Sequence, residues 1–128
     1  MDRASARTVL GVMRAAVGAQ ALTAPRLAAK TFGVDPERSN HWVTRLFGSR
    51  ELLLALYLLG APSDRVREAA SAGAVIDGID IVSSALELKA GRLSTYTTIT
   101  GGVGAGVFLA LGLIVRRQAQ DVNLTERD

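Results

Sequence analysis

Three stretches of the chain that are otherwise rich in apolar residues carry ionisable side chains. Arg14 lies in the first, Arg50 and Glu51 in the second, and Asp77 and Asp80 in the third. A charge held in apolar surroundings is costly unless an opposite charge and hydrogen bonds compensate it. Because one guanidinium can bind two carboxylates, we expect Arg14, together with Arg50, to meet these acidic side chains.

The charges of this group do not balance, since two arginines face three carboxylates. The excess negative charge predicts that one carboxyl holds a proton, or that a cation or a substrate amine completes the site. The alternative is a structural ion-pair network that fixes the register of the helices.

Other chemistry finds no support in the residue pattern. The chain has no cysteine and one histidine, His41, and it contains neither a metal-ligand cluster nor a nucleophile with a base. The sequence therefore predicts no catalytic residue, no metal and no cofactor, and it leaves enzymatic activity without a basis.

The charged residues recur at helical spacing beside small residues, so each stretch should present one small and polar face. In the first helix this face comprises Arg7, Gly11, Arg14, Gly18 and Ala21; in the second, Thr44, Gly48, Glu51 and Ala55; in the third, Ala70, Gly73, Asp77, Asp80, Ser84 and Glu87. The aliphatic residues of the third helix, Val75, Ile79, Val82 and Leu86, fall on another face.

Proline, glycine and capping residues predict where the helices begin and end. The expected helices run from about 5 to 24, from 25 to 33 as a short interfacial helix, from a cap at Asp35 to Gly60, from Ser63 to about Ala90, and across 93–115.

The last of these helices is the best membrane span, since no charged residue lies between Arg92 and Arg116. About 20 apolar residues suffice to cross a bilayer core. The sequence thus predicts an all-α protein, a four-helix transmembrane bundle with a short interfacial helix between the first two spans. One membrane domain covers 1–119, and 120–128 form a short polar tail. A cleaved signal peptide at the N-terminus and a soluble helical bundle are the competing interpretations.

Gly102 and Gly106 form a G-x-x-x-G pair in the last helix, which is typical of close helix packing in membranes. The expected partners are the lipid bilayer and a second copy of the chain or a larger membrane protein. The net charge of +3 is spread along the chain without a basic run, so nucleic acid is not expected.

Basic residues beside the spans predict the orientation. Arg116 and Arg117 directly follow the best span. Cytoplasmic loops of inner or plasma membrane proteins carry an excess of basic residues, so we expect cytoplasmic termini.

Four short motifs carry a resemblance that spans roughly residues 8–115. They are Pro25, Phe32-Gly33, the run from Arg45 to Leu52 (RLFGSREL), and Asp77-Gly-Ile-Asp80. The chain resembles an uncharacterised family of small bacterial, mainly actinobacterial, four-helix integral membrane proteins, and more loosely the DoxX-like architecture. The resemblance implies a multi-pass bundle and supplies no activity.

These observations favour an accessory or interaction subunit with an intramembrane Arg–Asp network. The alternative is a small carrier or channel for a proton, a cation or a small organic solute that uses the same polar interior.

Overall fold

The computed structural model describes residues 2–125, and in this part of the chain helices are the only regular secondary structure, without a strand. Its helices are α1 (Arg3–Thr23), α2 (Pro25–Thr31), α3 (His41–Gly60), α4 (Val66–Lys89) and α5 (Thr95–Thr125), with a 3-10 turn, η1 (Ser63–Arg65), before α4. The all-α prediction is confirmed, and the short helix that was expected between the first and second long helices is present.

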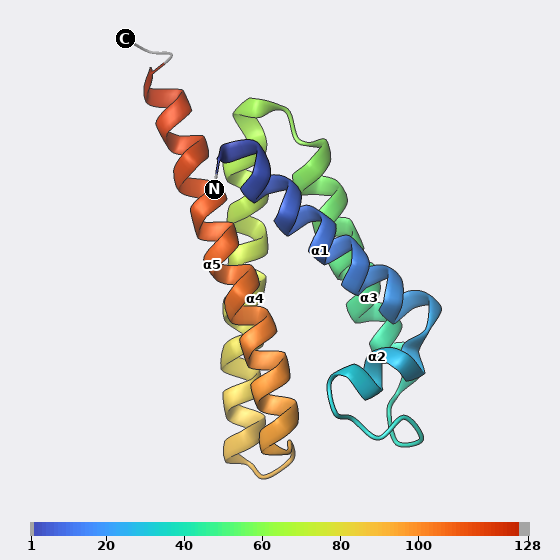
Figure 1. Ribbon diagram of the computed structural model, residues 1–128. Coiled ribbons are helices and arrows are strands. Elements are labelled where there is room, and N and C mark those ends of the chain that lie inside the picture. Colours follow the sequence, from blue (N-terminus) through green and yellow to red (C-terminus); the bar gives the residue numbers. More distant parts are fainter. Residues whose placement is uncertain (1, 126–128) are drawn as a thin grey trace.

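The four long helices form two pairs, α1 with α3 and α4 with α5 (Figure 1). The pairs meet at one end of the molecule, where α1 begins and α5 ends, and they diverge toward the end that carries α2 (Figure 1). The hydrophobic core lies where the pairs meet and includes Leu10, Leu58, Val66, Phe108 and Val115. Away from this core, the divergence leaves space between the two pairs.

Close contact between α1 and α3 depends on two glycines. A Cβ atom added to Gly18 would lie 2.7 Å from the carbonyl oxygen of Gly48, and one added to Gly48 would lie 2.8 Å from that of Gly18. Real Cβ atoms do not approach backbone atoms so closely. Both residues belong to the small faces predicted for these helices, so the sequence pattern identified this seam.

Arg7 joins the start of α1 to the end of α3. Its guanidinium donates to the carbonyl oxygens of Leu58 at 2.9 Å, Leu59 at 2.9 Å and Ala61 at 2.7 Å. The last carbonyls of a helix have no partner within the helix, so an arginine here satisfies acceptors that would otherwise stay open. Arg7 belongs to the inner face that helical spacing predicted for α1, but the spacing gave no indication that it would cap α3.

The second long helix begins later than the sequence predicted. The Asp35 side chain accepts a hydrogen bond from the Glu37 amide, but this closes only a turn, and the residues from Phe32 to Asn40 remain outside the regular helices. The cap of α3 is Asn40, whose Oδ1 accepts from the amides of Trp42 and Val43. An aspartate followed by proline fits a turn as well as a helix start, which explains the error.

The expected inner and outer faces of α4 are confirmed except at Glu87, which was expected on the inner face and pairs instead with Arg92 at the exposed end of the helix. Gly73 and Asp77 are buried, whereas Val75, Ile79 and Val82 are exposed. The last helix is longer than expected, since α5 continues past Arg116 and Arg117 to Thr125. Residues 120–125 of the predicted polar tail are therefore helical, and 126–128 lie outside the described residues.

Two helical segments are long and apolar enough to cross a membrane, by length and composition. They are Ser63–Lys89, whose most apolar 18-residue stretch has a mean hydropathy of 1.4, and Thr95–Val122, whose stretch of the same length has a mean hydropathy of 2.0. The other two long helices carry charges along their length, Arg7 and Arg14 in α1 and Arg45, Arg50 and Glu51 in α3.

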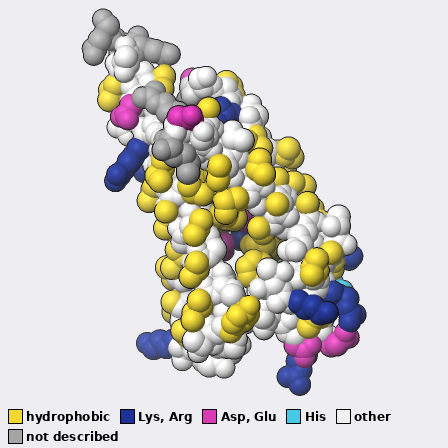
Figure 2. Space-filling model, in the orientation of Figure 1, with side chains coloured by type: hydrophobic (Ala, Val, Ile, Leu, Met, Phe, Trp, Pro, Cys, Tyr) yellow, Lys and Arg dark blue, Asp and Glu magenta, His cyan; other side chains and the backbone are white. Residues whose placement is uncertain are grey.

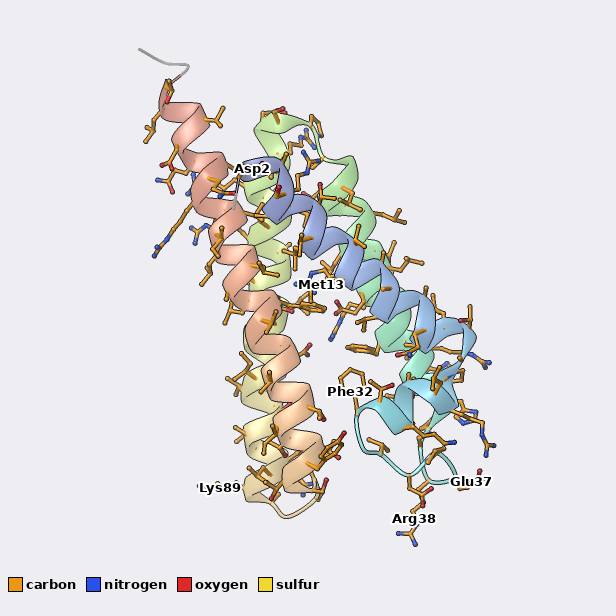
Figure 3. All side chains as sticks on the ribbon, viewed as in Figure 1. Asp2, Met13, Phe32, Glu37, Arg38 and Lys89 are labelled. Carbon is orange, nitrogen blue, oxygen red and sulfur yellow. The ribbon has the colours of Figure 1, made fainter. Side chains whose placement is uncertain are left out.

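On the face that Figure 2 shows, charged side chains gather toward the two ends and hydrophobic side chains cover much of the area between them. In Figure 3, Asp2 marks one end, and Glu37, Arg38 and Lys89 mark the other. All four long helices contribute exposed aliphatics to the middle, including Val12 in α1, Leu53 in α3, Val82 in α4 and Val103 in α5.

Candidate functional site

Arg14 is the centre of a buried ion-pair network. It is 1% exposed, and its guanidinium reaches Glu51 of α3 at 2.6 Å and Asp77 of α4 at 2.5 Å. Each of these carboxylates is also 1% exposed. One guanidinium therefore connects three helices at a point that is shielded from solvent.

Space for the Arg14 side chain comes from Gly73, one turn before Asp77 on α4. A Cβ atom at Gly73 would lie 3.0 Å from one terminal nitrogen of Arg14, so a larger residue would press on the guanidinium. The opposite side is covered by Phe108 of α5, whose ring centroid lies 4.7 Å from Cζ of Arg14. A cation held over an aromatic face gains electrostatic stabilisation where water is excluded.

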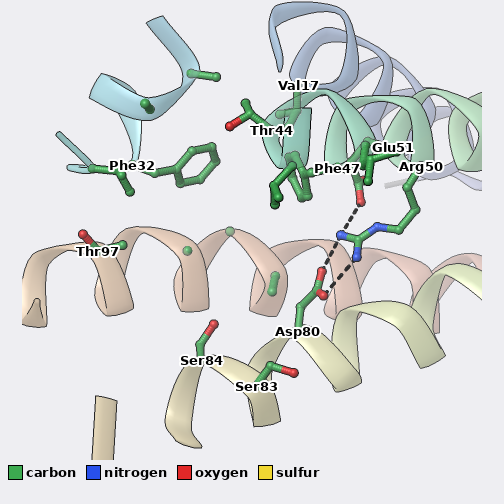
Figure 4. Close-up of a pocket in the computed structure, with 18 of the residues that line it drawn as sticks. Val17, Phe32, Thr44, Phe47, Arg50, Glu51, Asp80, Ser83, Ser84 and Thr97 are labelled. Carbon is green, nitrogen blue, oxygen red and sulfur yellow. Dashed lines mark hydrogen bonds and ion pairs between the residues drawn. The ribbon is translucent and has the colours of Figure 1, made fainter. Parts of the chain in front are cut away.

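Arg50 extends the network toward a second carboxylate of α4. Its two terminal nitrogens donate to both oxygens of Asp80, at 3.2 and 2.7 Å, and one of them also donates to Glu51 at 3.1 Å (Figure 4). Its Cζ lies 5.0 Å from the centroid of the Phe47 ring. The Asp80 side chain is 31% exposed, so this end of the network is accessible where the Arg14 end is not.

A cavity of about 660 Å³ lies directly beside this network, between the α3 and α2 side of the molecule and the α4–α5 pair. Its polar end is formed by Arg50, Glu51, Asp77 and Asp80, with Ser83 and Ser84 beside them. Figure 2 shows a hollow with acidic and basic side chains at its base and hydrophobic side chains around it. Cavities that hold small ligands have volumes of about 300–1,000 Å³ and few polar groups among apolar ones.

Away from the charges the cavity is apolar and aromatic. The chain has three phenylalanines, and all of them, Phe32, Phe47 and Phe108, line the cavity. Phe32 lies at the end opposite Asp80, and its ring meets that of Phe47 edge to face, with ring centroids 6.4 Å apart (Figure 4). The cavity therefore has a charged end and an aromatic end.

The aromatic end is closed by contacts between α5 and the segment after α2. Thr97 donates from its hydroxyl to the carbonyl oxygen of Gly33 at 3.3 Å. The Thr100 hydroxyl oxygen lies 3.4 Å from the carbonyl oxygen of Phe32, but the carbonyl of Tyr96, at 3.0 Å, is its nearer acceptor. Gly33 has a φ of +70° and lies against Tyr96, where a side chain would collide with the ring. Glycine is thus required at the point where the chain turns back over the cavity.

The structure brings Arg14, Arg50, Glu51, Asp77 and Asp80 into one connected group. Sequence reasoning missed the cavity beside them and its three phenylalanines. One indication of this wall was present in the sequence. Each phenylalanine lies within a turn or two of a small-residue face or of a predicted helix end. That signal is weak without knowledge of how the helices diverge.

The two glycines predicted for helix packing have no partner within the described chain. No atom lies within 4 Å of a Cβ built at Gly102 or Gly106. The close crossing in this structure is made by Gly18 and Gly48 instead, and a partner for the α5 glycines would have to be another molecule. A Cβ atom at Gly104, between these two glycines, would also meet no neighbouring atom. Gly104, however, faces the cavity within the molecule.

Within residues 2–125 no group of three or more histidines and acidic residues is arranged to hold a metal ion. Comparison of the chain with protein-family models, with curated protein sequences and with solved structures gave no match. The function must therefore be argued from the site itself.

Proposed function

We propose that this chain is a four-span membrane protein that binds a small organic solute in the cavity beside its ion-pair network, as a carrier does. The observation that carries the proposal is the cavity of about 660 Å³ whose apolar walls end on buried charges. A purely structural network needs no adjoining cavity, and an empty one reduces packing.

The membrane part of the proposal draws support from the direction in which the charges face. The ionisable residues in the middle of α1 and α3, Arg14 and Glu51, are buried, while aliphatics such as Val12 and Leu53 face outward. Membrane bundles hold ionisable side chains inside and present apolar ones to lipid. α1 and α3 are less apolar than a typical membrane span because of these charged residues, but they suit a bilayer when those residues face the interior.

Binding can be tested with three probes that share one apolar body and differ in their head group: 4-phenylbutylammonium, 4-phenylbutanol and 4-phenylbutyrate. The purified protein in detergent is heated with each probe, and a rise in Tm measures binding. We expect at least one probe to raise Tm.

Two glycine variants of α5 make the test specific for the cavity. Gly104→Leu places a side chain in the cavity, whereas Gly102→Leu, two residues away, does not face it. Both positions are free of close contacts, so both variants should fold. The proposal predicts that the Tm rise disappears in Gly104→Leu and persists in Gly102→Leu. It is wrong if no probe raises Tm, or if both variants respond as the original chain does.

An accessory role is the second candidate, and the free face of α5 favours it. Gly102 and Gly106 lie in open space on a helix that exposes Ile99 and Val103. Close helix approach in lipid uses such glycines, so this face suits a second membrane helix, from another copy or from a larger protein. Gly102→Leu should then reduce chemical cross-linking between copies in native membranes, or pull-down of the larger protein, while Gly104→Leu should not.

Orientation and compartment follow the same proposal. α1 begins and α5 ends at the same end of the molecule (Figure 1), as an even number of spans requires. With Arg116 and Arg117 at that end, we propose cytoplasmic termini in an inner or plasma membrane. Kinship with the small actinobacterial four-helix family is part of this proposal.

A further inference from the structure

We infer that the solute is an organic monocation: an ammonium group bound at the Asp77–Asp80 end of the cavity, on an apolar or aromatic body that lies along the phenylalanines. This inference rests on the proposed function and specifies the chemical class of its ligand.

Charge is the first argument. Every ionisable group at the polar end belongs to the network of Arg14 from α1, Arg50 and Glu51 from α3, and Asp77 and Asp80 from α4. The described residues of α2 and α5 contribute no charge to the cavity wall. Two positive and three negative groups leave one negative charge, and a single positive charge on a ligand neutralises it.

Unused acceptors at the same place are the second argument. Arg14 binds only Oδ2 of Asp77, and Oδ1 has no hydrogen-bond partner among the described residues, although Asp77 is 1% exposed and lines the cavity. Ser83 and Ser84 also line the cavity, and their hydroxyls make no hydrogen bond to the rest of the described chain. Oδ1 of Asp77 is open to the cavity, where it can accept a hydrogen bond, and an ammonium group offers several donors.

The third argument is the aromatic wall. Phe47 and Phe108 already stack on Arg50 and Arg14, which shows that these ring faces are placed near positive charge. Among the described residues, no arginine stacks on the ring of Phe32, which meets that of Phe47 edge to face. Rings near carboxylates suit a cation with an apolar body, since both the charge and the body gain contacts.

Other ligand classes fit less well. With all three carboxylates ionised, an anion would add to the excess negative charge, and a neutral solute would leave it uncompensated. A bare metal ion would find too few oxygen ligands, because both oxygens of Asp80 are bound by Arg50 and most of the wall is hydrocarbon.

The test compares dissociation constants of 4-phenylbutylammonium and 4-phenylbutanol by equilibrium dialysis at pH 7.5, with empty micelles subtracted. We expect the ammonium probe to bind at least tenfold more tightly than the alcohol. Asp77→Asn should bring the two constants to within about threefold of each other. Asp64→Asn, at an exposed position outside the cavity, should leave the tenfold preference intact.

The comparison within the unaltered chain does not depend on whether Asp77→Asn folds. If the alcohol or 4-phenylbutyrate binds as tightly as the ammonium probe, and Gly104→Leu abolishes that binding, the inference is wrong and the proposed solute site stands. If no probe binds in a way that depends on Gly104, the proposed function fails with it. A tenfold preference that survives Asp77→Asn also overturns the inference, because the charge would then be recognised elsewhere.

Discussion

At the scale of the residue, Arg14 holds together charges that none of its neighbours could keep buried alone. It pairs with Glu51 and Asp77, and Glu51 in turn shares Arg50 with Asp80. Removal of Arg14 would leave Asp77 without any cationic partner among the described residues. The network therefore fixes the positions of α1, α3 and α4 relative to one another.

We predict that Arg14→Gln lowers the free energy of unfolding by about 3–5 kcal/mol, the cost of leaving one partner of a buried ion pair uncompensated. Unfolding in mixed detergent micelles measures the change. Addition of Asp77→Asn to Arg14→Gln should recover part of the loss, because the second substitution removes the orphaned charge.

The matched control for Arg14 is Arg38→Gln. Arg38 lies at an exposed turn, where its pairing with Asp35 is open to solvent, so its loss should change stability by less than about 0.5 kcal/mol. Equal stability of Arg14→Gln and the original chain would contradict the structural role of the network.

At the scale of the element, the α1–α3 pair rests on a glycine crossing and an arginine cap. The crossing brings the backbones together at Gly18 and Gly48, and the cap joins Arg7 to the last carbonyls of α3. The two contacts lie at different places along the same pair, so they can be tested separately.

For the crossing, we predict that Gly18→Ala destabilises the protein by more than the 1–3 kcal/mol of ordinary overpacking, because the new methyl would meet backbone and not a movable side chain. Gly78→Ala in α4 is the control, since nothing lies within 4 Å of its Cβ position. Alanine favours helix over glycine by about 1 kcal/mol, so Gly78→Ala should be neutral or stabilising. If the two variants have the same Tm, the α1–α3 crossing is not as close as described.

For the cap, Arg7→Gln should lower the free energy of unfolding by about 1.5–3 kcal/mol, the range for hydrogen bonds from a charged group. Hydrogen exchange should also quicken in the last turn of α3, near Leu58, while the first turn, near Trp42, is unchanged. Unaltered exchange at both ends would show that Arg7 does not hold this helix end.

Some features of the helices could be predicted from the sequence and others could not. Helical spacing identified the inner faces of α1, α3 and α4, since small and charged residues recur on them while aliphatics fall elsewhere. It could not decide between Asp35 and Asn40 as the cap of α3, because both residues accept hydrogen bonds from nearby amides. Nor could it tell that Gly18 and Gly48 would be covered within the chain while Gly102 and Gly106 would stay open.

At the scale of the whole molecule, the site exists because two helix pairs meet at one end and diverge at the other. The sequence was sufficient to predict that the ionisable side chains of the apolar stretches meet, because an unpaired charge in apolar surroundings is costly. The cavity could not, because its volume depends on the angle between the pairs and on the segment after α2 that closes one end. Phe32, Phe47 and Phe108 come together only through that geometry.

The same geometry bears on the four-span membrane arrangement that we propose. Two helices are apolar enough to span a membrane by composition, and α1 and α3 reach the same condition only through the inward direction of their charges. The proposed four-span arrangement thus depends on the interior position of Arg14 and Glu51 and on the exposed position of Val12 and Leu53, which would face lipid.

The most direct test uses the absence of cysteine from the chain, which allows single cysteines to be placed without background. Val12→Cys in α1 and Leu53→Cys in α3 are treated with a membrane-impermeant maleimide in native membranes, with Arg38→Cys as the exposed control. We predict that Arg38→Cys is labelled on one side of the membrane, and that the other two react only after detergent is added and the protein is unfolded. Labelling of Val12→Cys and Leu53→Cys in intact membranes, as fast as the control, would contradict the proposed four-span arrangement and the proposed solute site with it.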